Sequence, residues 1–145
     1  MELEVKHLSP YLPYGLKLQY VVREKVEQTG IMKSISHNED ETHPTRVSIS
    51  SMYNEEHIWM FKPILKPLSQ FEYDHIVQVK EHLGLGQWCD HYDQYFDAWF
   101  DDAESVQKLV LQCPYEIMQF FLECHFDVFG LIDAGLATEL SYGFA

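Results

Sequence analysis

Arginine is nearly absent from this 145-residue chain, which contains only Arg23 and Arg46. Arginine supplies the planar, bidentate donors that many phosphate and carboxylate sites use. Nucleic-acid affinity also depends on cations that neutralise phosphates. The scarcity therefore argues against a dedicated phosphate site and against direct binding to DNA or RNA.

Cysteine is scarce as well. Cys89, Cys113 and Cys124 are odd in number and include no C-x-x-C pair. A disulfide framework is therefore not expected, and a reducing compartment is the default.

The sequence lacks targeting segments and long apolar runs. Its first six residues, Met-Glu-Leu-Glu-Val-Lys, are acidic and contain no apolar segment typical of a signal peptide. No uncharged run approaches the roughly 20 apolar residues that span a bilayer. We expect a soluble cytoplasmic protein without a membrane partner.

Short motifs of common active sites are also missing. The sequence has no G-x-S-x-G, H-E-x-x-H, P-loop or EF-hand loop. A catalytic role is therefore less expected than a binding role, and we expect no cofactor.

What the chain does have is a strongly one-sided charge. Fourteen of its 23 acidic residues follow Gln70, where only Lys80 and Lys108 are basic, so residues 71–145 carry a net charge of −12. Residues 1–70 contain nine acidic and eight basic residues, a net charge of −1. Such a field repels phosphate and anionic lipid and attracts cations and basic protein surfaces. We expect a partner with a basic surface.

Length and composition predict one domain over residues 1–145, mainly strand over 1–68 and mainly helix over 69–145. The polar stretch His37–Pro44 predicts a loop, and Pro63 and Pro67 predict an edge or a strand exit. Alternating or continuous apolar residues predict strands over Leu16–Val22, Gly30–Ser36, Arg46–Tyr53 and His57–Leu65.

Helical periods dominate the second half. A capping box at Ser69 predicts a helix that ends near Gly84, and Pro114 suits the first turn of a helix with an apolar stripe that continues to Val128. The predicted fold class is α+β: a short-stranded antiparallel sheet or small barrel, packed by three to four helices.

The stretch from Trp88 to Asp102 predicts an acidic-aromatic helix. Its aspartates recur at three- and four-residue steps, and its aromatic residues share another face. One hypothesis is a recognition surface for a basic partner; regularly spaced carboxylates can also imitate the charges of DNA. The alternative is an ordinary amphipathic helix with aspartates in water. The candidate interaction surface is Trp88, Asp90, Asp93, Asp97, Trp99, Asp101 and Asp102.

Two groups of residues contain histidines that could take part in metal binding or catalysis. His75, His82, Cys89 and His91, with Cys124 and His125 as further donors, are candidate zinc ligands, but they match no strict zinc spacing, so no metal is favoured. We expect these histidines at the surface and Cys124 in the core.

His125 and Asp127 could instead form an acid–base pair. Residues two apart on a helix do not face each other, which favours a structural role. Asp127 is then expected to accept main-chain donors near Gly130, and His125 to form a hydrogen bond within the core.

Three segments resemble a group of small uncharacterised proteins encoded by phages and prophages of gut bacteria: Leu8–Lys17 (LSPYLPYGLK), Lys62–Ser69 (KPILKPLS) and His125–Ala137 (HFDVFGLIDAGLA). The resemblance implies a phage-related setting, which favours a role in host interaction. It assigns no activity, ligand or catalytic residue.

These observations predict a non-enzymatic, acidic protein-interaction module of phage type, with a DNA-mimic inhibitor of host defence as a special case. One alternative is a small metal-binding protein or enzyme that uses the histidine and cysteine set. Another is a structural or homo-oligomeric phage protein that associates through exposed aromatic residues.

Overall fold

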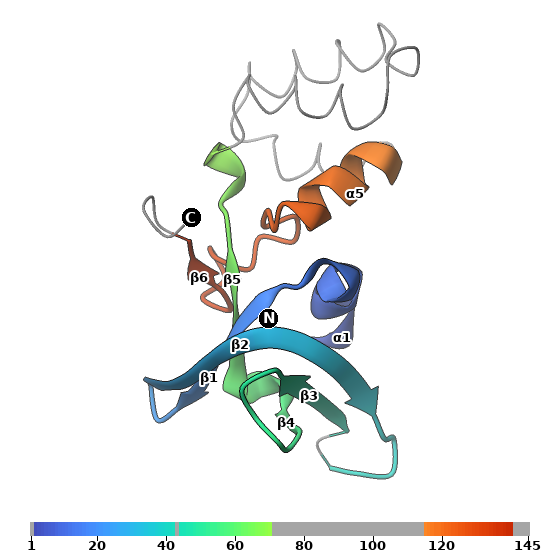
Figure 1. The fold of residues 1–145 in the computed structure, drawn as a ribbon, viewed down its shortest axis with the longest axis vertical. Helices are drawn as coiled ribbons and strands as arrows, with labels where there is room; N and C mark the ends of the chain where they lie inside the picture. Colours follow the sequence, from blue (N-terminus) through green and yellow to red (C-terminus); the bar gives the residue numbers. More distant parts are fainter. Residues whose placement is uncertain (1, 43, 71–114, 141–145) are drawn as a thin grey trace, which may run out of the picture.

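The computed structural model describes residues 2–42, 44–70 and 115–140, and every structural statement below concerns these residues. Figure 1 shows their arrangement. In the text, η denotes a 3₁₀ helix. In chain order the elements are α1 (Val5–Leu8), η1 (Ser9–Tyr14), β1 (Lys17–Val22), β2 (Lys25–His37), β3 (Thr45–Ile49), β4 (Glu56–His57), η2 (Ile58–Met60), β5 (Phe61–Leu65), η3 (Leu68–Gln70), α5 (Tyr115–Glu123) and β6 (Thr138–Glu139).

The strands form one six-stranded sheet in the order β4-β3-β2-β1-β5-β6. Neighbours from β4 to β5 are antiparallel, whereas β6 is parallel to β5, so the sheet is mixed. The first part of β2 pairs with β1 and its last part with β3. Figure 1 shows β2 as a long arc between these two partners.

Two register shifts account for the curvature of β2. The first leaves Glu27 without a paired residue on β1, and the second does the same for Lys33 opposite β3. Such bulges bend a strand and increase its twist. The sheet therefore curls, and η2 contacts both β1 and β3.

The hydrophobic core lies between this curved sheet and the segments α1, η1 and α5. In Figure 1, α1 and η1 lie between the strands and α5. The fully buried apolar side chains of the core come from both described parts of the chain, before and after residues 71–114. They are Leu8, Tyr11, Leu16, Leu18, Val47, Ile49, Leu65, Ile117, Phe121, Phe126, Val128 and Leu131. One core thus joins residues 2–70 to residues 115–140.

The fold-class prediction is wrong. Instead of three or four helices on a short-stranded antiparallel sheet, the described residues form a mixed six-stranded sheet with two α-helices, of four and nine residues. The strand β2 alone has 13 residues. The helices predicted over 69–84 and 88–102 lie outside the described residues, apart from Ser69 and Gln70, which belong to η3.

The helix predicted from Pro114 is α5, and it ends at Glu123 instead of continuing to Val128. His125 has a left-handed backbone, with a φ of 62°. The N–H of His125 donates to Leu122 O (3.1 Å) and that of Phe126 to Phe121 O (2.9 Å), as in a Schellman motif. The chain then turns back toward β5 and forms β6.

The predicted strands occur, with altered limits. The strand predicted over Arg46–Tyr53 ends at Ile49, and that over His57–Leu65 is divided by η2. Its second part, β5, is not an edge strand, because it lies between β1 and β6. Pro63 is the last residue of β5 paired with β1, and pairing with β6 begins at Ile64.

Candidate functional site

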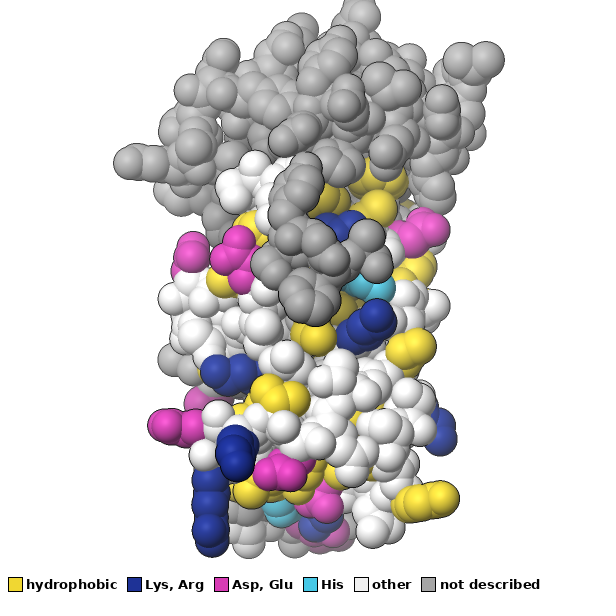
Figure 2. Space-filling view, turned by 60° about the vertical axis from the view of Figure 1, so that its left-hand side comes forward, with side chains coloured by type: hydrophobic (Ala, Val, Ile, Leu, Met, Phe, Trp, Pro, Cys, Tyr) yellow, Lys and Arg dark blue, Asp and Glu magenta, His cyan; other side chains and the backbone are white. Residues whose placement is uncertain are grey.

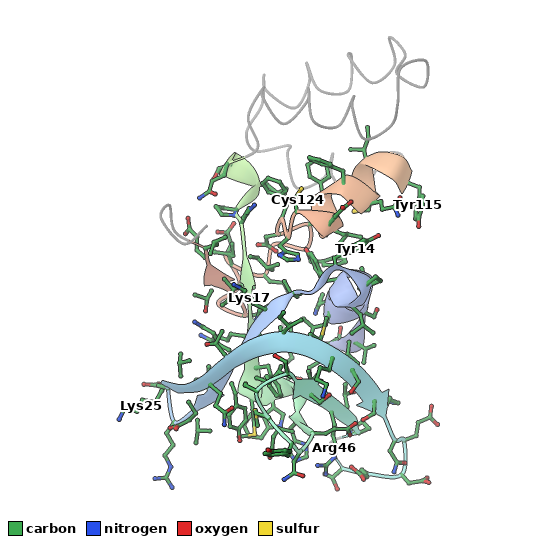
Figure 3. All side chains as sticks on the ribbon, viewed as in Figure 1. Tyr14, Lys17, Lys25, Arg46, Tyr115 and Cys124 are labelled. Carbon is green, nitrogen blue, oxygen red and sulfur yellow. The ribbon has the colours of Figure 1, made fainter. Side chains whose placement is uncertain are left out.

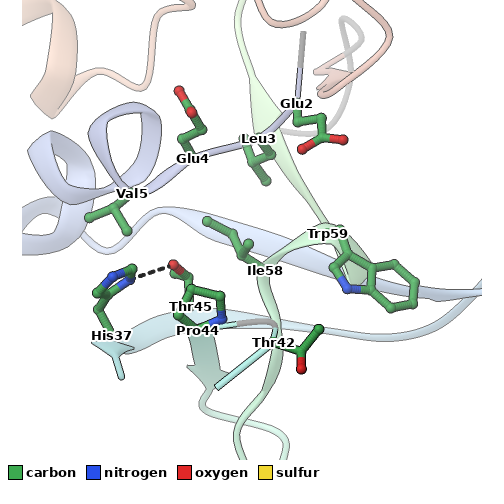
Figure 4. Close-up of a pocket in the computed structure, with 10 residues that line it drawn as sticks. All are labelled: Glu2, Leu3, Glu4, Val5, His37, Thr42, Pro44, Thr45, Ile58 and Trp59. Atoms are coloured by element: carbon green, nitrogen blue, oxygen red, sulfur yellow. Dashed lines mark hydrogen bonds between the residues drawn. The ribbon is translucent and has the colours of Figure 1, made fainter. Parts of the chain in front are cut away.

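A groove of about 440 Å³ lies between the N-terminal segment, the β2–β3 loop and η2. Figure 4 shows the residues that line it. Leu3 and Ile58, both nearly buried, contribute apolar surface, as do Val5 and Pro44. Trp59 is the aromatic residue among them. The groove therefore combines apolar surface with one large aromatic side chain, beside the polar residues Glu2, Glu4, His37, Thr42 and Thr45.

Trp59 is held in position by its neighbours. Ile58, the first residue of η2, is 8% exposed, whereas Trp59, the next residue, is 62% exposed. The His57 ring lies parallel to the indole, with an interplanar angle of 8° and centroids 5.9 Å apart. The 3₁₀ turn thus directs Ile58 into the core and presents the indole to solvent.

The β2–β3 loop forms an ordered side of the groove. His37 Nδ1 and Thr45 Oγ1 are 2.9 Å apart, across the last residue pair of β2 and β3. Asn38 N–H donates to Pro44 O (2.8 Å), and Asp40 N–H donates to Asn38 Oδ1 (3.1 Å), as in an Asx turn. These bonds stabilise the described part of the loop.

The N-terminal segment forms the opposite wall. Leu3 is 7% exposed, and Glu4 N–H donates to His7 Nδ1 (3.0 Å), which fixes the turn into α1. This acceptor role requires the His7 proton on Nε2. The pKa of His7 is lowered, mainly by burial and secondly by Lys6, so the ring is held neutral. Glu4 pairs with Lys6 (3.1 Å) and turns away from the floor of the groove.

The charge around the groove is negative. Residues 2–6 and 37–46 contain the acidic residues Glu2, Glu4, Glu39, Asp40 and Glu41, against the basic residues Lys6 and Arg46. Arg46 Nε lies 3.2 Å from Glu41 Oε2. Elsewhere, on the face drawn in Figure 2, lysine and arginine are interspersed with aspartate and glutamate over the described residues. Of the acidic residues named above, Glu2 and Glu4 line the groove itself, and no Lys or Arg among the described residues does so.

The second group of polar residues, Tyr11, His125 and Asp127, is tied to the main chain. The Tyr11 hydroxyl donates to Phe126 O and accepts the Val128 N–H (3.3 Å). His125 Nε2 lies 2.7 Å from Tyr14 O; Figure 3 shows Tyr14 in the region between η1 and α5. These contacts leave the group a structural role.

Asp127 accepts two main-chain donors beyond Gly130, from Leu131 to Oδ1 (2.8 Å) and from Ile132 to Oδ2 (2.9 Å). Burial raises the pKa of this carboxyl, while the N–H groups of Ile132 and Leu131 act in the opposite direction. The predicted hydrogen bonds of Asp127 to main-chain donors near Gly130 and of His125 within the fold are thus confirmed.

This polar group lies where the three phage-like segments meet. Lys66 N–H donates to His125 O (2.9 Å), and Asp127 N–H donates to Lys66 O (2.8 Å). Tyr11 and Tyr14 join the first segment to the third through the bonds above. These hydrogen bonds join Leu8–Lys17, Lys62–Ser69 and His125–Ala137 in the fold.

The sequence-predicted site residues fall mostly outside the described residues: Trp88, Asp90, Asp93, Asp97, Trp99, Asp101, Asp102, His75, His82, Cys89 and His91. Cys124, a further candidate donor, is half-buried against the core, and burial raises the pKa of its thiol. Within residues 2–42, 44–70 and 115–140, no three His, Cys, Asp or Glu side chains are grouped so that they could hold a metal.

The groove was missed by reasoning from sequence. Ile58, Trp59, Met60 and Phe61 form a continuous apolar run, which is typical of a buried strand. The 3₁₀ turn changes the direction of Trp59, and no glycine or proline within the run signals that turn. Glu2, Thr42 and Pro44 line the same groove as Trp59 because the sheet curves and brings these distant segments together.

No helix in the described part of the chain has both the length and the apolar character needed to cross a membrane. Comparison of the chain with protein-family models, with curated proteins and with solved structures found no match.

Proposed function

We propose that this protein is a non-enzymatic interaction module that binds a basic partner protein inside a host cell. The observation that carries the proposal is the net charge of −12 over residues 71–145, against −1 over residues 1–70. A field of one sign accelerates encounter with a surface of the opposite sign and suppresses anionic partners. Asp90, Asp93, Asp97 and Asp101 are the proposed contact residues.

The described residues support this proposal through the groove beside Trp59. It combines apolar surface, an exposed indole and an excess of carboxylates, features that suit recognition of a protein surface. The phage-like segments favour a partner from the host. A special case is a DNA mimic that occupies the nucleic-acid site of a host defence nuclease or polymerase.

The test is capture of partners from a phage-infected host by the tagged chain, with mass spectrometry of the retained proteins. The variant D97K/D101K should retain less of the basic partner than the parent chain does, and D90K/D93K/D97K/D101K should retain none. The matched control E24K/E27K makes the same change in net charge as D97K/D101K, but in the first half, and should keep the partner. Equal retention by all variants would contradict the proposal.

The DNA-mimic case adds one expectation to the same experiment. Duplex DNA added to the captured complex should displace the chain from its partner, because both ligands would occupy one basic site. If the complex survives excess duplex DNA and still depends on the aspartates, the partner is bound at another basic surface.

Two alternatives predict other results in the same preparations. Stoichiometric zinc by elemental analysis would favour a metal site that includes His75, His82, Cys89 and His91. A mass above that of the monomer by light scattering, unchanged by salt, would favour self-association through exposed apolar residues such as Tyr53 and Tyr115.

A further inference from the structure

We propose that the groove beside Trp59 binds an extended peptide segment and takes up one of its lysine or arginine side chains. In this arrangement the cation lies against the indole of Trp59 near Glu2, and the aliphatic part of the side chain lies along Leu3 and Ile58. The inference rests on the proposed function in one respect, namely that the partner is basic. It adds a second surface and the chemistry that this surface recognises.

The indole provides the first argument. Tryptophan is the aromatic side chain that binds cations best, through the negative potential of its face. His57 stacks parallel to Trp59, while 62% of the tryptophan surface is exposed. The indole thus keeps a large exposed surface that a cation can approach from solvent.

The apolar floor provides the second argument. Lysine and arginine cover apolar surface with their aliphatic stems while their charged ends stay in contact with water or acidic groups. Leu3 and Ile58 line the groove beside Trp59, and Pro44 lies across from them (Figure 4). A volume of about 440 Å³ suits one long side chain and part of the main chain that bears it.

Charge complementarity selects the sign of the ligand. The two charged residues that line the groove, Glu2 and Glu4, are both acidic. Glu4 and Glu41 each have a cationic partner, whereas Glu2 lies at the same end of the groove as Trp59 (Figure 4). An anionic ligand such as phosphate or nucleic acid would be repelled, and a basic peptide attracted.

The probe is a synthetic nonapeptide of glycine and serine with three lysines, compared with the same peptide in which norleucine replaces lysine. Binding to the full chain is followed by NMR through the Trp59 indole N–H, which is assigned by its absence in Trp59→Phe. We expect a saturable shift of this signal with the lysine peptide and none with the norleucine peptide.

Variants then test the groove itself. Trp59→Ala should weaken lysine-peptide binding about 5- to 30-fold, the range for a partly desolvated cation–aromatic contact. Glu2→Gln should weaken it about 2- to 5-fold, with a smaller dependence on salt. Tyr53→Ala removes a fully exposed aromatic residue that does not line the groove, and it should leave the affinity unchanged. Circular dichroism checks that each variant is folded.

The outcomes separate this inference from the proposed function. If the lysine peptide leaves the Trp59 signal unchanged, or if Trp59→Ala binds it as well as the parent chain, the groove is not its site. Lysine-peptide binding that is lost in D97K/D101K but kept in Trp59→Ala would also contradict binding in the groove, and it would support binding by the acidic residues 71–145. Conversely, the peptide could bind at Trp59 while the aspartate variants capture host proteins as well as the parent chain does. That result would support the groove as a peptide site and contradict the proposed function.

Discussion

Tyr11 and Phe126 are 115 positions apart in the chain, yet the Tyr11 hydroxyl donates a hydrogen bond to the Phe126 carbonyl in the fully buried core. The same hydroxyl accepts the Val128 N–H at 3.3 Å. Burial raises the pKa of Tyr11 far above its usual range, so the phenol stays protonated and keeps its donor. One side chain thus joins the N-terminal segment to the chain that follows α5.

The first prediction concerns this hydroxyl. Tyr11→Phe keeps the ring but leaves the Phe126 carbonyl and the Val128 N–H buried without this partner, which should lower the free energy of unfolding by about 2 kcal/mol. Denaturant unfolding measures the change. Tyr14→Phe is the matched control, because among the described residues the Tyr14 hydroxyl has no recorded hydrogen bond; a change below about 0.5 kcal/mol is expected. Similar losses in both variants would contradict the assigned role.

The second prediction concerns the left-handed backbone of His125. Alanine is strained at a φ of 62° and glycine is not, so His125→Gly should be more stable than His125→Ala by about 1 kcal/mol. Both variants lose the contact with Tyr14 O, which therefore cancels in the comparison. Within α5 the order should reverse, because glycine disfavours a helix. The free energy of unfolding of Gln119→Ala should exceed that of Gln119→Gly by about 1 kcal/mol. Alanine preferred at both positions would show that His125 is not left-handed in solution.

The third prediction concerns the contribution of His7 to the pH dependence of folding stability. Its pKa in the folded chain lies below the usual 6.5, so between the two values the unfolded chain binds a proton that the folded chain does not. The stability contribution of neutral His7 is therefore fully present above about pH 6.5. It is lost as the pH falls toward the folded pKa. Burial is the main cause of the lowered pKa, Lys6 acts in the same direction, and Glu4 and Asp127 act against it.

The variant His7→Gln tests this sign. Glutamine at the third helical position can accept the Glu4 N–H without titrating. Unfolding measured from pH 7.5 to 5 should show a smaller fall in stability for His7→Gln than for the parent chain. The parent chain, measured over the same range, provides the reference slope. If His7→Gln keeps that slope, His7 is not held neutral by the fold.

The fourth prediction concerns the turn between β1 and β2. Arg23 and Glu24 have φ values of 51° and 66°, the left-handed conformation that a two-residue type I′ turn requires. Replacing them with Asn-Gly, the residues that this turn favours, should raise the free energy of unfolding by about 1 kcal/mol or more. Gln28→Gly, inside β2, should lower it by about 0.5–1 kcal/mol. A destabilising Asn-Gly replacement would mean that the hairpin turn has another form.

Local patterns predicted part of this structure. The alternation from Leu16 predicted β1 nearly to the residue, since one face of that strand packs on the core. Asp127 was predicted to bind main-chain donors near Gly130, because a short carboxylate beside a helix end commonly does so. Both predictions depend only on residues within a few positions of each other.

The features that were missed depend on distant partners. The sequence of Thr138–Glu139 has no strand pattern. These residues form β6 because they pair with the edge of β5 that β1 leaves unpaired. His125 is not a usual residue for a left-handed helix end, and its contact with Tyr14 O holds it there. Trp59 is exposed because η2 redirects an apolar run. In each case tertiary contacts override the local preference.

The parallel pairing of β6 with β5 and the bridge between Lys66 and Phe126 have a consequence during protein synthesis. The residues that cover this side of β5 follow it in the chain, so they are synthesised after the strand itself. A nascent chain that stops before Phe126 therefore has an unpaired edge on β5 beside apolar surface. Unpaired strand edges and exposed apolar surface promote aggregation of such intermediates.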